Sequence, residues 1–200
     1  MLIKSKYKIA RRLGPQIFEK TQTQKYASRA GEKRFERGRG VSDFGKALLE
    51  KQKARFTYLV NERQFKNYAA VAIAEKKRKP EEILLESLEM RIDSVVYRLG
   101  LVKTRLAARQ AVSHGHISVN GKRVTASSYR VSIGDTVGVM ARSQKSKLFV
   151  DVAERAKEYN APNWLTFDSS KLEGKVKSKP SYAPAELAFD VATILDFYKR

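Results

Sequence analysis

Basic side chains are concentrated between residues 98 and 130, at spacings that suit a polyanionic ligand. Arg98 is followed by Lys103 and Arg105, and Arg109 comes one helical turn after Arg105, so the last two share a helix face. Four further basic residues follow in the same segment: His114, Lys122, Arg123 and Arg130. Phosphates near a helix start also meet free backbone N–H groups, so the cluster predicts a surface for the backbone of folded RNA.

The same segment offers little to an enzyme. The chain has no Cys, which excludes a Cys nucleophile, and His114 and His116 are its only histidines, too few for a catalytic zinc site. Asp93 and Asp135 are the only acids of residues 91–147, against 11 basic residues, so paired-carboxylate chemistry lacks its groups. An ordinary charged helix face, the alternative to an RNA surface, would carry more acids. We therefore predict no catalytic residue, metal, cofactor or small-molecule substrate.

The formal net charge of +20 is distributed unevenly along the 200 residues. Residues 1–80 hold 22 basic and 7 acidic residues, 81–90 hold four acids and no base, and 148–200 hold eight of each. Separated basic blocks favour two anion-facing surfaces. An anionic membrane is the other possible polyanion, but no apolar run approaches the ~20 residues that span a bilayer. With no Cys and no secretory signal, we expect an intracellular, cytoplasmic protein.

The first 41 residues show little periodicity and contain the run Arg37-Gly38-Arg39-Gly40, which is typical of a flexible RNA-binding tract. Such a segment is predicted to be ordered mainly by its partner. The candidate RNA-binding residues of the first basic block are Arg11, Arg12, Arg34, Arg37, Arg39, Lys46, Lys51, Lys53, Arg55, Arg63 and Lys66.

Elements that could position these residues follow from periodicity. Helical spacing begins at the N-cap pair Ser42-Asp43, and Pro80 suits the start of a further helix. Asp93 and Thr104 are candidate caps of two short helices, over about 93–99 and 104–114. The apolar period then changes to two through residues 117–139, including Val131 and Ile133, and Asn120-Gly121 predicts a hairpin.

The tail adds a predicted helix over 150–157, a strand starting near 162–165, and a final apolar helix that needs a surface to bury against. The helical domain is the obvious surface. We therefore predict an α+β fold: a helical domain, two helices packed on a small twisted antiparallel or mixed sheet, and a C-terminal helix that returns to the helical domain. The predicted parts are a basic extension (1–41), helical domain (42–90), RNA-binding domain (91–150), its extension (151–185) and C-terminal helix (186–200).

Two runs carry a family resemblance: IDSVVYRLG at 92–100 and TRLAARQAVSHGHISVNG at 104–121. They closely resemble the RNA-binding domain named after small-subunit ribosomal protein four, which also occurs in pseudouridine synthases and tyrosyl-tRNA synthetases. SDFGKALLEKQKAR at 42–55 and WLTFD at 164–168 are similar to other parts of that ribosomal family. The resemblance covers about residues 42–200.

The resemblance implies a structural constituent of the small ribosomal subunit. Family members bind a multi-helix junction in the 5′ domain of small-subunit ribosomal RNA early in assembly. They neighbour small-subunit ribosomal protein five and, with proteins three and five, line the channel through which messenger RNA enters, with a role in translational accuracy. Many members bind zinc through cysteines near their start, so a chain without Cys resembles a zinc-free variant.

Two other functions are compatible with the same RNA-binding module. One is a free-standing regulator that binds messenger RNA or stalled ribosomes. The other is an RNA-modifying enzyme, which would need a further catalytic domain that neither flank of the module offers. The sequence therefore favours a ribosomal protein that is not an enzyme.

Overall fold

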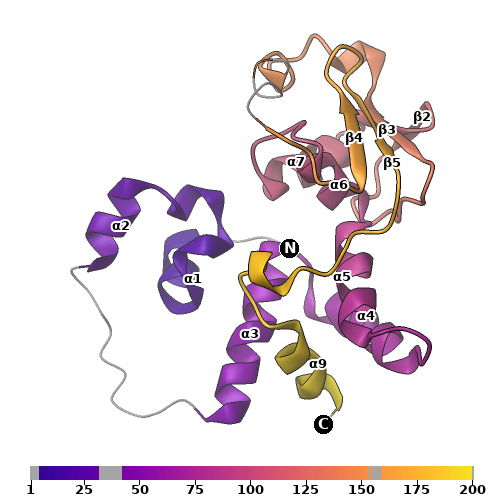
Figure 1. Cartoon of the computed structure of the whole chain (residues 1–200). Helices are drawn as coiled ribbons and strands as arrows, with labels where there is room; N and C mark the ends of the chain where they lie inside the picture. The colour runs from indigo at the N-terminus through magenta and orange to yellow at the C-terminus, as the bar shows by residue number, and fades with distance from the viewer. Residues whose placement is uncertain (1–4, 32–41, 153, 155–158, 200) are drawn as a thin grey trace. The chain divides into compact units, whose positions relative to one another are not determined.

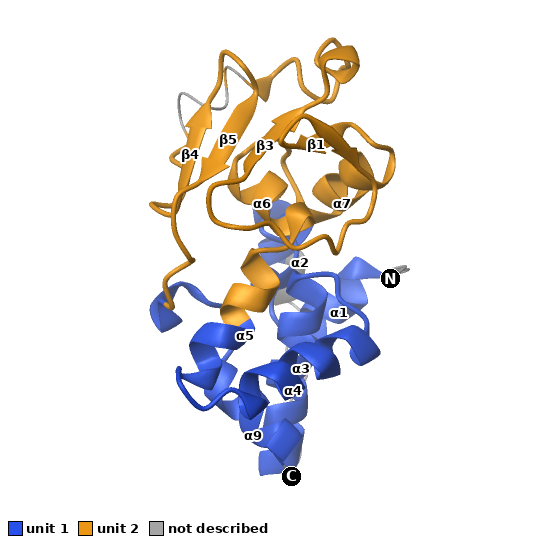
Figure 2. Cartoon of the chain, turned by 90° about the vertical axis from the view of Figure 1, so that its right-hand side faces the viewer, with its two compact units in different colours: residues 1–84, 183–200 blue, residues 85–182 orange. Residues whose placement is uncertain are grey.

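The computed structural model describes residues 5–31, 42–152, 154 and 159–199, and it divides into two units (Figure 2). The first unit comprises residues 1–84 and 183–200 and is helical where it is described. The second comprises residues 85–182 and contains the sheet. Helix α5 (Pro80–Glu89) begins in the first unit and ends in the second.

Side-chain caps set where the main helices of the first unit begin. The helices of this unit before α5 are α1 (Lys6–Leu13), α2 (Gln24–Gly31), α3 (Asp43–Thr57) and α4 (Glu62–Ala74). The Ser42 hydroxyl accepts a hydrogen bond from the Gly45 backbone at 3.2 Å, which caps α3 as predicted. The Asn61 side chain accepts one from Gln64 at 2.8 Å and caps α4 in the same way.

The last helix, α9 (Val191–Lys199), packs against α3 and α4 (Figure 1). It buries Val191, Ile194 and Leu195, and the Phe189 ring meets the buried Tyr58 edge-to-face at 6.2 Å. The predicted return of the C-terminal helix to the helical domain is confirmed.

Residues 5–31 differ from the prediction for the first 41 residues. Ala10 and Leu13 of α1 are buried together with Ile17, Phe18 and Tyr26, and Leu49 and Phe56 of α3 pack against this cluster. Residues 5–31 therefore have apolar contacts with α3 that the low periodicity of this segment did not predict. Arg34, Arg37 and Arg39 lie outside the described residues.

The second unit is a five-stranded antiparallel sheet in the order β2-β1-β3-β5-β4, with two helices that share its apolar core (Figure 1). The elements are α6 (Ile92–Arg98), α7 (Arg105–Ser113), β1 (Ile117–Val119), β2 (Lys122–Val124), β3 (Thr136–Val139), β4 (Leu165–Asp168) and β5 (Glu173–Val176). The α+β fold is confirmed. At the β1–β2 turn, Asn120 has φ 50° and Gly121 has φ 76°, as the predicted hairpin requires. The Asn120 side chain also accepts a hydrogen bond from the Thr136 backbone at 2.9 Å.

Three local predictions need correction. Residues 130–133 form no strand: only an isolated bridge joins Arg130 to Arg91, and Ile133 is exposed. Asp93 does not cap α6, which begins one residue earlier, at Ile92. Half of the predicted helix at 150–157, residues 153 and 155–157, falls outside the described residues. Within the residues that are described, the helices are too short or too polar to cross a bilayer.

Candidate RNA-binding surfaces

Two buried acids at the end of α5 neutralise several of the predicted RNA-binding cations. Glu89 is only 3% exposed, and its carboxylate accepts hydrogen bonds from Arg98 at 2.7 and 3.0 Å and from Arg105 at 3.2 Å. Glu86 is also buried and pairs with Arg130 at 2.7 Å and with Lys179 at 3.3 Å. Glu86 and Glu89 belong to the acidic segment 81–90, which the charge pattern suggests is a separate spacer. In the structure they bind cations of the second unit.

The Arg105 side chain makes several contacts within the second unit. Besides Glu89, it donates to the Ser94 hydroxyl at 3.1 Å, and its guanidinium carbon lies 4.6 Å from the centre of the Tyr97 ring. Its side chain is only 12% exposed. Arg105 therefore joins α7 to α6, and little of its side chain is exposed to a phosphate. Arg98 and Arg130 keep more solvent exposure but are also ion-paired.

A second buried pair was missed by the sequence reasoning. Arg91 donates to both oxygens of Asp93, at 2.9 and 2.6 Å, and both residues are buried. Because Asp93 stands near a helix start, its pattern is that of a cap, although its partner is only two residues away in the sequence. The pair lies where the chain passes from α5 into α6.

Three of the predicted RNA-binding cations of the second unit are exposed beside the start of α7 and in the β1–β2 hairpin. Lys103 and Lys122 are exposed and, within the described part of the chain, take part in no ion pair. Arg123 is exposed, and its guanidinium rests against Gly115. The Thr104 hydroxyl caps α7 by accepting from the Ala107 backbone at 3.1 Å, directly after Lys103.

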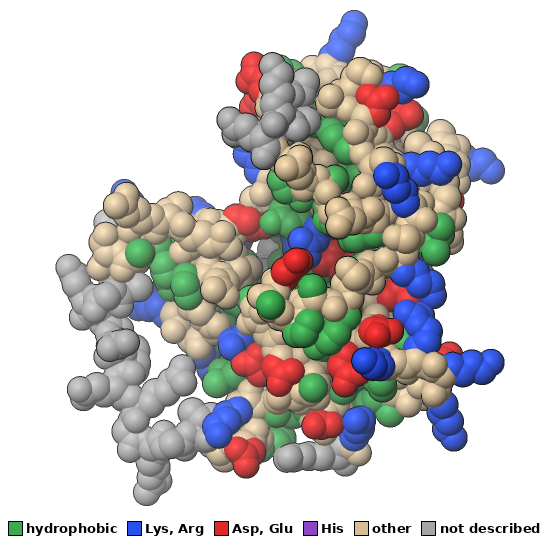
Figure 3. Space-filling view, viewed as in Figure 1, with side chains coloured by type: hydrophobic (Ala, Val, Ile, Leu, Met, Phe, Trp, Pro, Cys, Tyr) green, Lys and Arg blue, Asp and Glu red, His purple; other side chains and the backbone are tan. Residues whose placement is uncertain are grey.

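A set of basic side chains forms what we call the α7–hairpin surface. It consists of Lys103, Arg109, His114, Lys122 and Arg123, of which Arg109 is partly buried. Lys103 directly precedes the start of α7, where the helix dipole also favours the negative charge of a phosphate. Figure 3 shows Lys and Arg side chains standing out from the second unit on the side of β2 and β5.

The two histidines lie near each other at the end of α7 and before β1. Their ring centres are 6.0 Å apart, and His116 Nδ1 is hydrogen-bonded to the Ser143 hydroxyl at 2.9 Å. The described residues contain no group of three or more His, Asp or Glu that could hold a metal ion. His114 remains exposed on the α7–hairpin surface.

In the first unit, Lys51 and Arg55 bind Glu62 and are not presented to a ligand. Lys51 donates to the Glu62 carboxylate at 3.0 Å, its ammonium lies 4.4 Å from the centre of the Phe197 ring, and its side chain is 9% exposed. Arg55 pairs with Glu62 at 2.9 Å, and the Tyr198 hydroxyl donates a hydrogen bond to the Glu62 carboxylate at 2.8 Å. The network joins α3, α4 and α9, so the prediction of RNA contacts at Lys51 and Arg55 does not fit the structure.

The network also shifts two pKa values. Burial alone raises the pKa of Glu62, but hydrogen bonds from Lys51 and Tyr198 and the charge of Arg55 together hold it below its ordinary value. Burial and the hydrogen bond to Glu62 raise the pKa of Tyr198. The carboxylate is therefore stabilised in its charged form when α9 is in place.

Other predicted cations of the first unit lie at its surface. Lys46 pairs with Asp43 at 3.2 Å and Lys53 with Glu50 at 2.6 Å, both within α3. Four cations are exposed and, in the described residues, have no ion-pair partner: Arg11 and Arg12 of α1, and Arg63 and Lys66 of α4. Arg63 and Lys66 are three residues apart and so neighbour each other on the helix.

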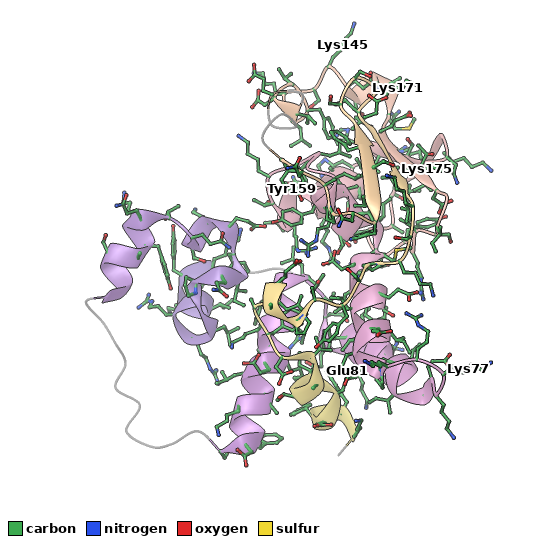
Figure 4. The ribbon with its side chains drawn as sticks, in the orientation of Figure 1. Lys77, Glu81, Lys145, Tyr159, Lys171 and Lys175 are labelled. Atoms are coloured by element: carbon green, nitrogen blue, oxygen red, sulfur yellow. The ribbon has the colours of Figure 1, made fainter. Side chains whose placement is uncertain are left out.

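Exposed lysines also occur where no RNA contact was predicted. Lys145, Lys171 and Lys175 project from the second unit (Figure 4). Lys171 and Lys175 flank the exposed Glu173, and Asp168 is nearby in the β4–β5 hairpin. This part of the unit mixes both signs of charge, unlike the α7–hairpin surface.

Comparison with known proteins matches the two units to two domain families. Residues 90–137 match the S4 domain, and residues 1–89 match the Ribosomal protein S4/S9 N-terminal domain. A protein of Chromobacterium violaceum named small ribosomal subunit protein uS4 is 40% identical over 98% of this chain and 97% of its own length. This chain belongs to the uS4 family.

Other relatives bear the same name. The uS4 protein of Roseiflexus castenholzii is 43% identical over 96% of both chains, and that of Herpetosiphon aurantiacus is 42% identical over 82% of this chain and 78% of its own. These relatives are ribosomal proteins and not enzymes, which confirms the prediction of a non-enzymatic protein. The S4 domain match ends inside β3 and contains every residue of the α7–hairpin surface.

Proposed function

We propose that this uS4-family chain is a structural constituent of the small ribosomal subunit and binds small-subunit ribosomal RNA directly. The observation that carries the proposal is that five basic residues lie within the S4 domain along α7 and in the β1–β2 hairpin, and that four of them, all but Arg109, are exposed. Exposed cations are the groups that neutralise RNA phosphates and release counterions.

The first unit supplies a second cationic surface in this proposal. Arg11, Arg12, Arg63 and Lys66 would contact further phosphates, while Lys51 and Arg55 keep α9 docked. Exposed cations on each unit support contacts at more than one place on the RNA. The finer placement that the family resemblance implies is part of the proposal: a helix junction of the 5′ domain, binding early in assembly, and neighbouring proteins five and three at the channel for messenger RNA.

Charge reversal on the α7–hairpin surface tests the proposal. The full chain would be titrated against a 5′-domain RNA transcript between 50 and 200 mM salt. Lys103→Glu with Lys122→Glu should weaken binding by roughly 10–100-fold and reduce the slope of log affinity against log salt by about two. Lys145→Glu with Lys147→Glu is the matched control, because it changes the same charge on exposed residues of the same unit.

Equal losses for the two double variants would show only that net charge matters, and would refute the assigned surface.

Sedimentation of a cell lysate then separates a ribosomal protein from a free-standing regulator. A subunit constituent should travel with small subunits and stay on them through a moderate-salt wash. Recovery only with free messenger RNA or at the top of the gradient would contradict the proposal.

A further inference from the structure

Tyr159 contacts the turn between α6 and α7 from a segment 61 residues further along the chain. Its hydroxyl donates to the Arg98 carbonyl at 3.2 Å, and its ring lies against Gly100 (Figure 4). Burial raises the pKa of Tyr159, so the phenol stays a neutral donor. The side chain is nonetheless 40% exposed, and it stands at the edge of the second unit rather than in its core.

The hydroxyl completes the C-terminus of α6. The last carbonyls of a helix have no partner within it. Here Leu99 N donates to Val95 O at 2.8 Å and Gly100 N donates to Tyr97 O at 3.0 Å, and the Arg98 carbonyl is taken by Tyr159. The hydrogen bond therefore ties the end of α6 to a distant part of the chain.

The ring fixes the next residue. Gly100 has φ +74°, a conformation that glycine adopts freely and other residues rarely do. An added Cβ would lie 2.7 Å from a ring carbon of Tyr159, so the ring fits closely only because residue 100 has no side chain. Three residues later comes the exposed Lys103, followed by the Thr104 cap of α7.

We propose that Tyr159 is a positioning residue for RNA binding, which holds the α6–α7 turn so that Lys103 and the start of α7 meet one phosphate together. The inference rests on the proposed function, since it names a residue that serves the same surface. Tyr159 acts through the turn and makes no RNA contact itself. Its loss should therefore remove the contribution of Lys103.

The test is a double-mutant cycle on the full chain, with the 5′-domain transcript as probe. Lys103→Ala and Tyr159→Ala should each weaken binding about fivefold and lower the salt slope by about one, the loss of a single phosphate contact. Together they should cost about fivefold to tenfold, and the slope should fall by about one in total. Tyr159→Phe keeps the ring on Gly100 and should fall between wild type and Tyr159→Ala.

Tyr129→Ala is the matched control, because Tyr129 is 43% exposed in the same unit but does not touch the turn. It should change affinity less than twofold. Loss of affinity in Tyr159→Ala with an unchanged slope would indicate an uncharged, direct contact and overturn the inference. So would a fully additive double variant, with about 25-fold loss and a slope lowered by two.

Hydrogen exchange of the free protein gives a readout that needs no RNA. In Tyr159→Ala the amides of Leu99 and Gly100 should exchange faster, while amides of β1 and β3 keep their protection. Unchanged exchange at Gly100 would refute the positioning role even if RNA binds normally. Faster exchange in the variant, combined with no salt-dependent RNA binding by the wild type, would instead locate the failure in the proposed function.

Discussion

Replacing Glu89 by glutamine removes the charge that holds two arginines of the second unit in place. Glu89 is 3% exposed and binds Arg98 and Arg105 together, whereas these arginines are 31% and 12% exposed. Breaking a buried ion pair by removing one partner costs about 3–5 kcal/mol. Glutamine still accepts hydrogen bonds and Arg98 keeps some water, so we expect a loss of about 2–3 kcal/mol in the free energy of unfolding.

Urea unfolding followed by Trp164 fluorescence measures this loss, because the chain has a single Trp and it is buried in the core of the second unit. With a slope of about 2 kcal/mol per M, the midpoint should fall by roughly 1–1.5 M. Glu154→Gln is the control: this exposed glutamate forms no ion pair in the described residues, and its replacement should cost less than about 0.5 kcal/mol.

A second measurement separates the ion pair from general damage to α5. Arg105→Gln should cost clearly less in the Glu89→Gln background than in the wild type, because their shared interaction is already lost. Strict additivity, or a Glu89→Gln midpoint within about 0.2 M of wild type, would refute the claim that Glu89 anchors α7 to α6. Arg105 would then be a candidate RNA-binding residue again.

Two further predictions concern stability. The folded pKa of Glu62 lies below its unfolded value of 4.5, so its bonds to Lys51 and Tyr198 stabilise the fold above that pH. This stabilisation is lost as the pH falls through the folded pKa. Thermal melts followed by circular dichroism between pH 3 and 7 should therefore show a shallower loss of stability on the acid side in Glu62→Gln than in wild type. Gly174→Ala should destabilise the second unit by about 1–3 kcal/mol in the same urea assay, because a Cβ there would clash with Leu99 and lie 2.8 Å from a backbone oxygen of β4.

Local signals predicted the elements of this fold well. The Ser42 cap, the Asn120-Gly121 hairpin and the change of apolar period after α7 depend on residues close together in sequence, and each appears as expected. The return of α9 was also predictable, since a short apolar helix must bury its side chains. The segment 5–31 was not, because its few apolar residues are separated by basic ones and find their partners on α3.

The candidate site was predicted less completely, because the acids that bind Arg105 and Lys51 lie far from them in sequence. Arg105 lies 16 residues from Glu89, and Lys51 lies 11 residues from Glu62, so no helix spacing reveals either pair. Composition alone cannot distinguish a cation held by a buried acid from one exposed to a ligand. The exposed Lys103 and Lys122 lie in the same basic segment, residues 91–147, as the arginines that are paired.

The acids of α5 determine how much charge the second unit can offer to RNA. Residues 91–147 carry nine more basic than acidic residues, but Glu86 and Glu89, from outside that segment, bind Arg98, Arg105 and Arg130. Releasing Arg105 on binding would remove one of the cations that bind the buried Glu89, which is energetically unfavourable. The salt dependence of RNA binding should therefore reflect the exposed cations alone. The exposed cations of both units set an expected slope of log affinity against log salt. A measured slope larger by about three would mean that Arg98, Arg105 and Arg130 leave their acids and bind phosphates. The ion pairs would then describe only the RNA-free state of the protein.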